Sequence, residues 1–154
     1  MKKCLVVLFA LTIFFSCILP GFASVSTQSP KPDAAVSTTE IVYHADGSYT
    51  VTTFEIVSES RATKTGKKTK TCYNANGSTA FSVTNTSTFT YTGSSATCTS
   101  TTASKSITDS AWSVATGVIR SGNTGHVRYN GTHSSGTTNS GYVSISCSNT
   151  GVLS

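Results

Sequence analysis

The sequence predicts an all-β protein, a single antiparallel β-sandwich with an immunoglobulin-like arrangement of strands. Apolar residues recur at every second position in many short runs, and turn signals containing glycine separate these runs. No stretch repeats apolar residues with the helical period over the length of a helix. Because side chains alternate along a strand, the pattern predicts about seven or eight short strands, each with one buried face.

Residues 1–23 have the features of a secretory signal peptide. Two lysines precede an apolar run from Leu5 to Leu19, and the small residues Gly21 and Ala23 mark a cleavage site. The run is too short to cross about 30 Å of hydrocarbon comfortably. We therefore expect cleavage after Ala23, a secreted, extracellular product, and no membrane span in the mature form.

Lipidation at Cys17 is the alternative processing route. A small residue, Ser16, precedes this cysteine, as in a lipoprotein signal. However, Phe14 stands where such signals usually carry leucine, and the apolar run continues past Cys17. The better-formed cleavage site lies downstream, so we expect release rather than anchoring.

Cleavage would leave 131 residues, a length typical of one domain. Residues 24–38 carry both mature prolines and no apolar period, which predicts a disordered leader before a β-sandwich domain at 39–154. The mature net charge is +3, from nine cationic and six acidic residues, and is too small to indicate nucleic-acid binding. Ser and Thr supply 52 of the 131 residues, and β-branched Thr is expected on the outward faces of the sheets.

The first two strands are expected to form a hairpin with its turn at Asp46-Gly47, because glycine accepts the positive φ that such turns need. Along the second strand the apolar positions change parity between Val51 and Phe54. A β-bulge near Thr52-Thr53 would explain this change, since one extra residue redirects the side chains that follow.

The remaining elements follow from the same signals. Asn76-Gly77 marks a second turn, and the clearest alternation in the chain comes directly after it. A long polar loop is expected at 131–141 because that segment lacks apolar residues of strand spacing. The expected strands lie directly before the Asn76-Gly77 turn and around 81–91, 96–107, 111–116, 127–129 and 142–147.

The cysteine count is odd after cleavage, so at least one thiol is unpaired within the chain. Cys147 is in phase with the apolar residues of the last strand, which favours a Cys98–Cys147 disulfide. Cys72 is in phase with Lys68 and Lys70, and lysine side chains seldom point into a core. We therefore expect Cys72 to face outward as a free thiol.

Four lysines lie close together just before Cys72, namely Lys64, Lys67, Lys68 and Lys70. They are interpreted as a solvated strand edge that discourages edge-to-edge pairing. The same cluster could contact an anionic partner, although salt screens such exposed charges within about 8 Å.

No motif in the sequence indicates catalysis, a metal or a cofactor. His44, His126 and His133 lack zinc-binding spacing, and neither HExxH, CxxC nor GxSxG occurs. Glu55 and Glu59 could share a strand face as a glycosidase pair, but the charged segment that follows explains them as surface residues. We therefore expect no catalytic, cofactor-binding or metal-binding residues.

Aromatic residues offer one route to ligand binding, because exposed rings often bind sugars. The aromatic side chains that could act in this way, or belong to the core, are Tyr73, Trp112, Tyr129 and Tyr142. Trp112 is in phase with Val114 and is therefore assigned to the core.

The order of several segments resembles a group of small secreted proteins of Gram-positive bacteria with no established activity. The segments are EIVYHADGSYTVTTFEI, TKTGKKTKTCYNANGSTAFSVTNTSTFTYTGSSATCTS, DSAWSVATG, SGNTG and VSISCSNTG, and together they cover nearly all of the mature chain. The resemblance implies bacterial export and one β-rich domain, and it implies no catalytic residue.

The sequence is therefore interpreted as a secreted, non-enzymatic interaction module or cell-surface-associated module without a cofactor. Its expected partner is an anionic wall polymer or another surface protein. A bacteriocin-like toxin and a small hydrolase with a spatially assembled site are the alternatives, since a catalytic triad can be assembled from distant residues.

Overall fold

The computed structural model describes residues 37–154, which form eight strands. The predicted all-β class is confirmed, and the described residues include no helix long and apolar enough to cross a membrane. The first strand begins at Ser37, two positions before the predicted start of the domain, and the signal peptide lies outside the described residues. The strands are β1 (Ser37–Tyr43), β2 (Tyr49–Ser60), β3 (Thr63–Tyr73), β4 (Thr79–Tyr91), β5 (Ala96–Ile107), β6 (Trp112–Ser121), β7 (Thr124–His133) and β8 (Thr138–Ser146).

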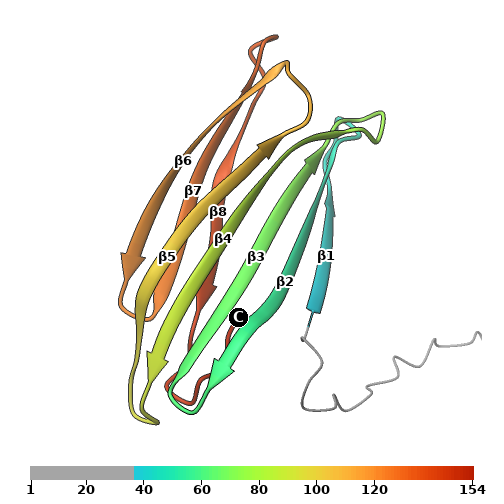
Figure 1. Ribbon diagram of the computed structural model, residues 1–154. Helices are drawn as coiled ribbons and strands as arrows, with labels where there is room; N and C mark the ends of the chain where they lie inside the picture. Colours follow the sequence, from blue (N-terminus) through green and yellow to red (C-terminus); the bar gives the residue numbers. More distant parts are fainter. Residues whose placement is uncertain (1–36) are drawn as a thin grey trace, which may run out of the picture.

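The strands form two antiparallel sheets packed face to face, so the predicted β-sandwich is confirmed (Figure 1). One sheet has the order β1-β2-β3-β4-β5 and the other has the order β6-β7-β8. In both sheets the neighbours are consecutive in sequence, whereas an immunoglobulin domain has Greek-key connections. The predicted immunoglobulin-like connectivity is therefore wrong, and the chain changes sheets once, between β5 and β6.

The predicted turn at Asp46-Gly47 is confirmed, but the predicted β-bulge is wrong. Gly47 has a φ of 82°, and it connects β1 to β2. Strand β2 keeps one register with β3 from Tyr49 to Ile56. The change of apolar parity instead places hydrophobic side chains on both faces, with Val51 on the outer face and Phe54, only 8% exposed, on the inner face.

The predicted long polar loop at 131–141 is also wrong. Strand β7 continues to His133 and β8 begins at Thr138, so residues 134–137 alone connect them. Polar residues such as Thr132 and Ser140 are exposed on the outer face of the small sheet, where strand pairing requires no apolar side chain, whereas His133 and Asn139 line a cleft between the sheets.

The space between the sheets holds two hydrophobic clusters. Strand β4 contributes to both, because the alternate residues from Phe81 to Phe89 face the second sheet. The first cluster contains Cys72, Ala80, Phe81, Val83, Val114, Val127, Tyr129 and Val143, and the second contains Phe54, Phe89, Cys98, Ile145 and Cys147.

A polar layer formed by Asn85, Ser87 and Thr101 separates the two clusters along β4 and β5. The Asn85 amide nitrogen donates hydrogen bonds to the carbonyl oxygens of Gly125 at 2.9 Å and Val143 at 2.7 Å. Ser87 donates to Asn85 Oδ1 at 2.7 Å, and both residues are 0% exposed. Because these buried groups have partners, the layer links the two sheets without leaving the Asn85 side chain unsatisfied.

The two long sides of the sandwich differ. On the closed side, formed by β5 and β6, the Arg120 guanidinium donates to Thr99 O at 2.6 Å, and Lys105 Nζ donates to Val114 O. On the open side, formed by β1, β2 and β8, strand β8 packs mainly on β3 and β4, and Phe54 of β2 joins Ile145 of β8 in the second cluster. Figure 1 shows β1 at the far edge of the large sheet, and all of its residues are exposed, whereas Thr50 and Phe54 on the inner face of β2 are buried.

Candidate functional site

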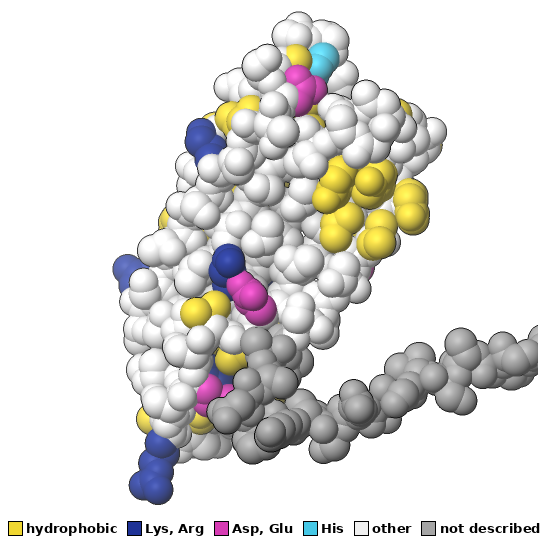
Figure 2. Space-filling view, turned by 45° about the vertical axis from the view of Figure 1, so that its right-hand side comes forward, with side chains coloured by type: hydrophobic (Ala, Val, Ile, Leu, Met, Phe, Trp, Pro, Cys, Tyr) yellow, Lys and Arg dark blue, Asp and Glu magenta, His cyan; other side chains and the backbone are white. Residues whose placement is uncertain are grey.

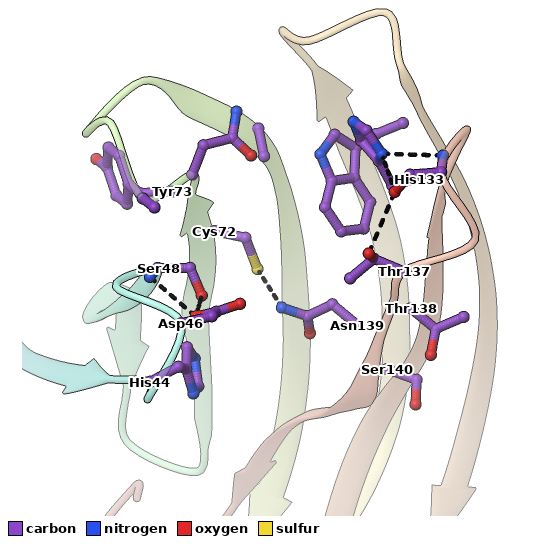
Figure 3. A pocket seen from close by; sticks show the side chains of 15 residues that line it. His44, Asp46, Ser48, Cys72, Tyr73, His133, Thr137, Thr138, Asn139 and Ser140 are labelled. Carbon is purple, nitrogen blue, oxygen red and sulfur yellow. Dashed lines mark hydrogen bonds between the residues drawn. The ribbon is translucent and has the colours of Figure 1, made fainter.

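A cleft of about 610 Å³ lies at one end of the sandwich, between the two sheets (Figure 3). The β1–β2 and β3–β4 turns form one rim, and the β7–β8 turn with the start of β6 forms the other. Strands β1 to β5 follow one another in the sheet in sequence order. The β1–β2 and β3–β4 turns therefore lie at the same end of the sheet. The lining residues include His44, Asp46, Cys72, Asn74, Trp112, His133 and Asn139.

Cys72 and Asn139 form the floor of the cleft. Asn139 Nδ2 donates to Cys72 Sγ at 3.6 Å, and the Tyr129 hydroxyl donates to Asn139 Oδ1 at 3.2 Å. Cys72 is only 4% exposed, and burial raises the pKa of its thiol although a hydrogen bond with Thr50 acts in the other direction. The floor therefore holds a neutral thiol and not a reactive thiolate.

Two aromatic side chains form one wall. The Trp112 and His133 rings meet edge to face with centroids 5.3 Å apart, and Trp112 also packs on Phe81 at 5.1 Å. His133 Nδ1 is held by the Ser135 hydroxyl at 2.7 Å. Within the described part of the chain, the buried Trp112 Nε1 has no hydrogen-bond partner.

Fixed polar groups form the opposite rim. Asp46 accepts hydrogen bonds from the Ser48 hydroxyl at 2.6 Å and from the Ser48 backbone N–H at 3.0 Å, which lower the pKa of its carboxyl. His44 Nε2 lies 3.1 Å from Thr50 Oγ1. These bonds hold the Asp46 carboxylate charged and orient the His44 ring.

Asn74 connects this rim to the turn between the sheets. Its side-chain nitrogen donates to Asp109 Oδ2 at 3.0 Å. The Ala111 backbone N–H and Asn74 both lower the pKa of the Asp109 carboxyl. The two turns are thereby linked, which fixes the width of the cleft at this point.

The predicted Cys98–Cys147 disulfide is wrong. Both residues belong to the second hydrophobic cluster, but neither they nor Cys72 form a disulfide in residues 37–154. The thiols face separate partners, because Cys98 Sγ lies 3.1 Å from Thr101 Oγ1 and Cys147 Sγ lies 3.3 Å from Ser148 O.

The predicted outward orientation of Cys72 is also wrong, although the phase that it shares with Lys68 and Lys70 is correct. All three side chains are on the inner face of β3. The lysines reach aromatic rings at the open side, with Lys68 Nζ 5.5 Å from the Phe54 ring centroid and Lys70 Nζ 5.6 Å from that of Tyr129. Long apolar stems allow a lysine to line a partly covered surface in this way.

The four lysines do not form a solvated edge, because β3 is the central strand of its sheet. Lys67 is on the outer face and pairs with Glu55 at 2.8 Å, while Lys64 pairs with Glu59 at 2.8 Å. These ion pairs also place the suggested glycosidase carboxylates away from the cleft.

His44 and His133 line opposite sides of the cleft, His126 lies outside it, and each imidazole has a hydroxyl neighbour. His126 Nδ1 lies 2.8 Å from Ser144 Oγ on the outer face of the small sheet, far along the strands from the cleft rims. Within residues 37–154 no imidazole hydrogen-bonds a carboxylate, and no three potential ligands gather as a metal site. The hydroxyl–imidazole pairs therefore lack the carboxylate that orients a catalytic histidine.

Sequence reasoning did not find the cleft. Asp46 was assigned to a turn and Asn139 fell in the predicted polar loop, while Asn74 and Thr50 were given no role. One signal could have indicated the cleft: in a meander, alternate turns lie at the same end of the sheet, so polar residues of those turns come together there.

Comparison with known proteins gives no identification. No protein-family model, no curated protein and no solved structure matches this chain. Its functional assignment therefore depends on the geometry of the cleft and of the two long sides.

Proposed function

We propose that this protein is an exported, non-enzymatic binding module whose end cleft holds a neutral saccharide. One observation carries the proposal: an indole ring and an imidazole form one wall of an open cleft, and fixed carboxylate and amide groups form the other. A sugar presents apolar C–H faces and hydroxyl groups that both donate and accept hydrogen bonds. Ligand sites commonly combine such apolar surface with a few oriented polar groups.

The charge of the cleft favours a neutral ligand over an anionic one. Asp46 lines it as a carboxylate, and among residues 37–154 the lining contains neither lysine nor arginine. An anionic wall polymer would meet this carboxylate without a compensating cation. The expected anionic contact is therefore not assigned to the cleft, and a neutral glycan of the cell surface or surroundings fits it better.

The state of Cys72 supports binding without catalysis. Its thiol is buried and its pKa is raised, whereas a cysteine nucleophile needs the thiolate. Asn139 and Thr50 surround the sulfur, and neither is a general base. The Cys72 side chain contributes to the floor of the cleft.

Intrinsic fluorescence tests the proposal directly, because Trp112 is the one tryptophan of the sequence. Neutral oligosaccharides, peptidoglycan fragments and anionic wall polymer would be titrated into the mature protein while tryptophan emission is recorded. We expect a neutral saccharide to change the emission. Asp46→Asn, which keeps the turn but removes the charge, should weaken binding about tenfold, the value of one charge-assisted hydrogen bond.

His126→Ala is the matched control, because it removes an imidazole with a hydroxyl partner outside the cleft. It should leave the affinity unchanged. Equal losses in Asp46→Asn and His126→Ala, or a response only to the anionic polymer, would contradict the proposal. Rapid labelling of Cys72 by iodoacetamide in the folded protein would favour the hydrolase alternative.

A further inference from the structure

The open side of the sandwich leaves part of an inner sheet face uncovered. Strand β8 packs on β3 and β4, and every residue of β1 is exposed, including Val42 of its inner face at 45%. Figure 2 shows a hydrophobic patch in the upper part of the molecule. Of the exposed apolar residues of β1, Val42 faces inward, whereas Ile41 and Tyr43 are on the outer face with their partners Val51 and Tyr49. An exposed sheet edge beside apolar surface is a common docking site for an extended chain.

The free edge of β8 has unpaired backbone groups. Ser146 exchanges two backbone hydrogen bonds with Ser154, at 2.9 and 3.0 Å, on the side away from β7. Because backbone groups alternate in direction along an antiparallel strand, Ser144, Tyr142 and Ser140 present theirs to the same side. These groups have no backbone partner in the described region. The chain thus begins a strand beside β8 and leaves the rest of that position open.

Two cations face this position from the inner surface. Lys68 and Lys70 are the lysines on the inner face of β3 without a carboxylate at ion-pair distance within residues 37–154, since Lys64 pairs with Glu59. Burial lowers the pKa of Lys68 despite the opposing effect of Glu40, so its charge is poorly solvated. An anion at this place would replace some of the missing hydration.

The spacing of the two lysines matches an extended peptide. Residues two apart on one strand face the same way and are separated by about 6.8 Å, which is also the spacing of alternate side chains in an added strand. Acidic residues at alternate positions of such a strand would both meet a lysine. Its remaining side chains would face outward beside Tyr142.

We propose that the open side binds an acidic, extended peptide segment of another exported protein, which pairs with the free edge of β8 and places alternate carboxylates at Lys68 and Lys70. The backbone groups of Ser140, Tyr142 and Ser144 bind any extended chain, and the lysines select an acidic one. The site adjoins the end cleft at Ser140, which lines that cleft, but it does not include the Trp112 and His133 wall and does not depend on a ligand bound there.

Other occupants satisfy fewer of these groups. A second copy would bring its own Lys68 and Lys70 toward Lys68 and Lys70 of the first copy, so that like charges would meet. Residues 24–36 include two prolines, which lack the backbone N–H that strand pairing needs, and balance Asp33 with Lys31. A wall polymer with phosphate groups would contact the lysines but has no peptide backbone to pair with β8.

A designed peptide tests the inference. A fluorescein-labelled peptide of about seven residues with alternating Thr and Glu spans the free edge of β8. We expect it to bind the mature protein by fluorescence anisotropy and to slow amide hydrogen exchange at Ser140, Tyr142 and Ser144. The combined variant Lys68→Met and Lys70→Met should bind at least about tenfold more weakly, because two charge-assisted contacts are lost.

Lys67→Met is the matched control, because Lys67 is a lysine of the same strand on the outer face. It should leave peptide affinity unchanged. A block peptide of the same composition and a peptide N-methylated at alternate backbone nitrogens should both bind poorly. Tryptophan emission and thermal unfolding would verify that each variant is folded.

Several results would overturn the inference. Equal binding of the N-methylated peptide would show that strand pairing is not used. Inorganic polyphosphate that binds more tightly than any peptide, with the same lysine dependence, would identify the occupant as an anionic polymer. Binding that appears only after residues 24–36 are removed would assign the site to that segment, and a dimer disrupted by the lysine variants would assign it to a second copy.

Discussion

Cationic side chains have different roles on the two long sides of the sandwich. On the closed side Lys105 and Arg120 reach across to backbone carbonyls of the opposite sheet, and on the open side Lys68 and Lys70 lie over aromatic rings. A charged hydrogen bond contributes about 1.5–3 kcal/mol where it is well formed, whereas an exposed cation–π contact contributes about 0.5–1 kcal/mol. Cations therefore close one side, and they remain available for a partner on the other.

The close approach of the sheets at the polar layer, where β7 meets β4 and β5, gives the largest expected effect. A methyl group at Gly125 would overlap Ser87 Oγ and Thr101 Oγ1, so Gly125→Ala should lower the free energy of unfolding by about 3 kcal/mol. Gly117→Ala is the control on the same sheet, because its methyl group would meet open space. Guanidinium unfolding followed by Trp112 emission measures both, and similar losses at the two positions would mean that the sheets can separate at little cost.

The cationic side chains of the closed side should have a smaller effect. Lys105→Met and Arg120→Met remove the donors to Val114 O and Thr99 O and should each cost about 1 kcal/mol, because both side chains are largely exposed. Exposed Arg128, with no hydrogen bond through its side chain in the described region, is the control. Hydrogen exchange of β6 amides should speed up in the first two variants, and unchanged exchange would show that the side is closed by packing alone.

Titration of Lys68, on the open side, should have the smallest effect on the free energy of unfolding. Burial lowers the pKa of this lysine in the folded protein, so the unfolded chain, with its ordinary value of 10.5, binds the proton more tightly. Stability should therefore rise as the pH increases through the folded pKa toward 10.5. The difference between wild type and Lys68→Met, measured by unfolding at several alkaline pH values, should show this rise, and a constant difference would place Lys68 in ordinary solvent.

The cleft floor should respond to alkali with the opposite sign. Burial raises the pKa of Cys72 above 9.0 and that of Tyr129 to about 12, so each contributes stability below its unfolded pKa that is lost as the pH rises through the folded value. The pH dependence of wild-type stability therefore combines opposite contributions. The difference between Lys68→Met and wild type gives the contribution of Lys68 alone.

Strands and turns were largely predictable because they depend on neighbours in sequence. The outward position of threonine was also predictable, and Thr69 and Thr84 confirm it with a hydroxyl contact of 2.9 Å on the outer face. Parity shows which residues share a face but not which face is covered. Cys72 was therefore grouped correctly with Lys68 and Lys70 and given the wrong direction.

The candidate site was less predictable because it depends on how distant turns meet. The turn at Asp46-Gly47 was recognised, but nothing local indicates that it lies opposite Trp112 and His133. That arrangement follows from the placement of one sheet on the other. The open side was hidden for the same reason, since it results from five strands facing three.

The polar layer has a further consequence for the folding of this chain. Long runs of Ser and Thr look alike at successive positions, so β4 could slip by two residues and still present alternating side chains. In a slipped alignment the Asn85 amide would lose the carbonyls of Gly125 and Val143 and be buried among apolar groups. One asparagine thus distinguishes the native alignment from its near copies in a repetitive sequence.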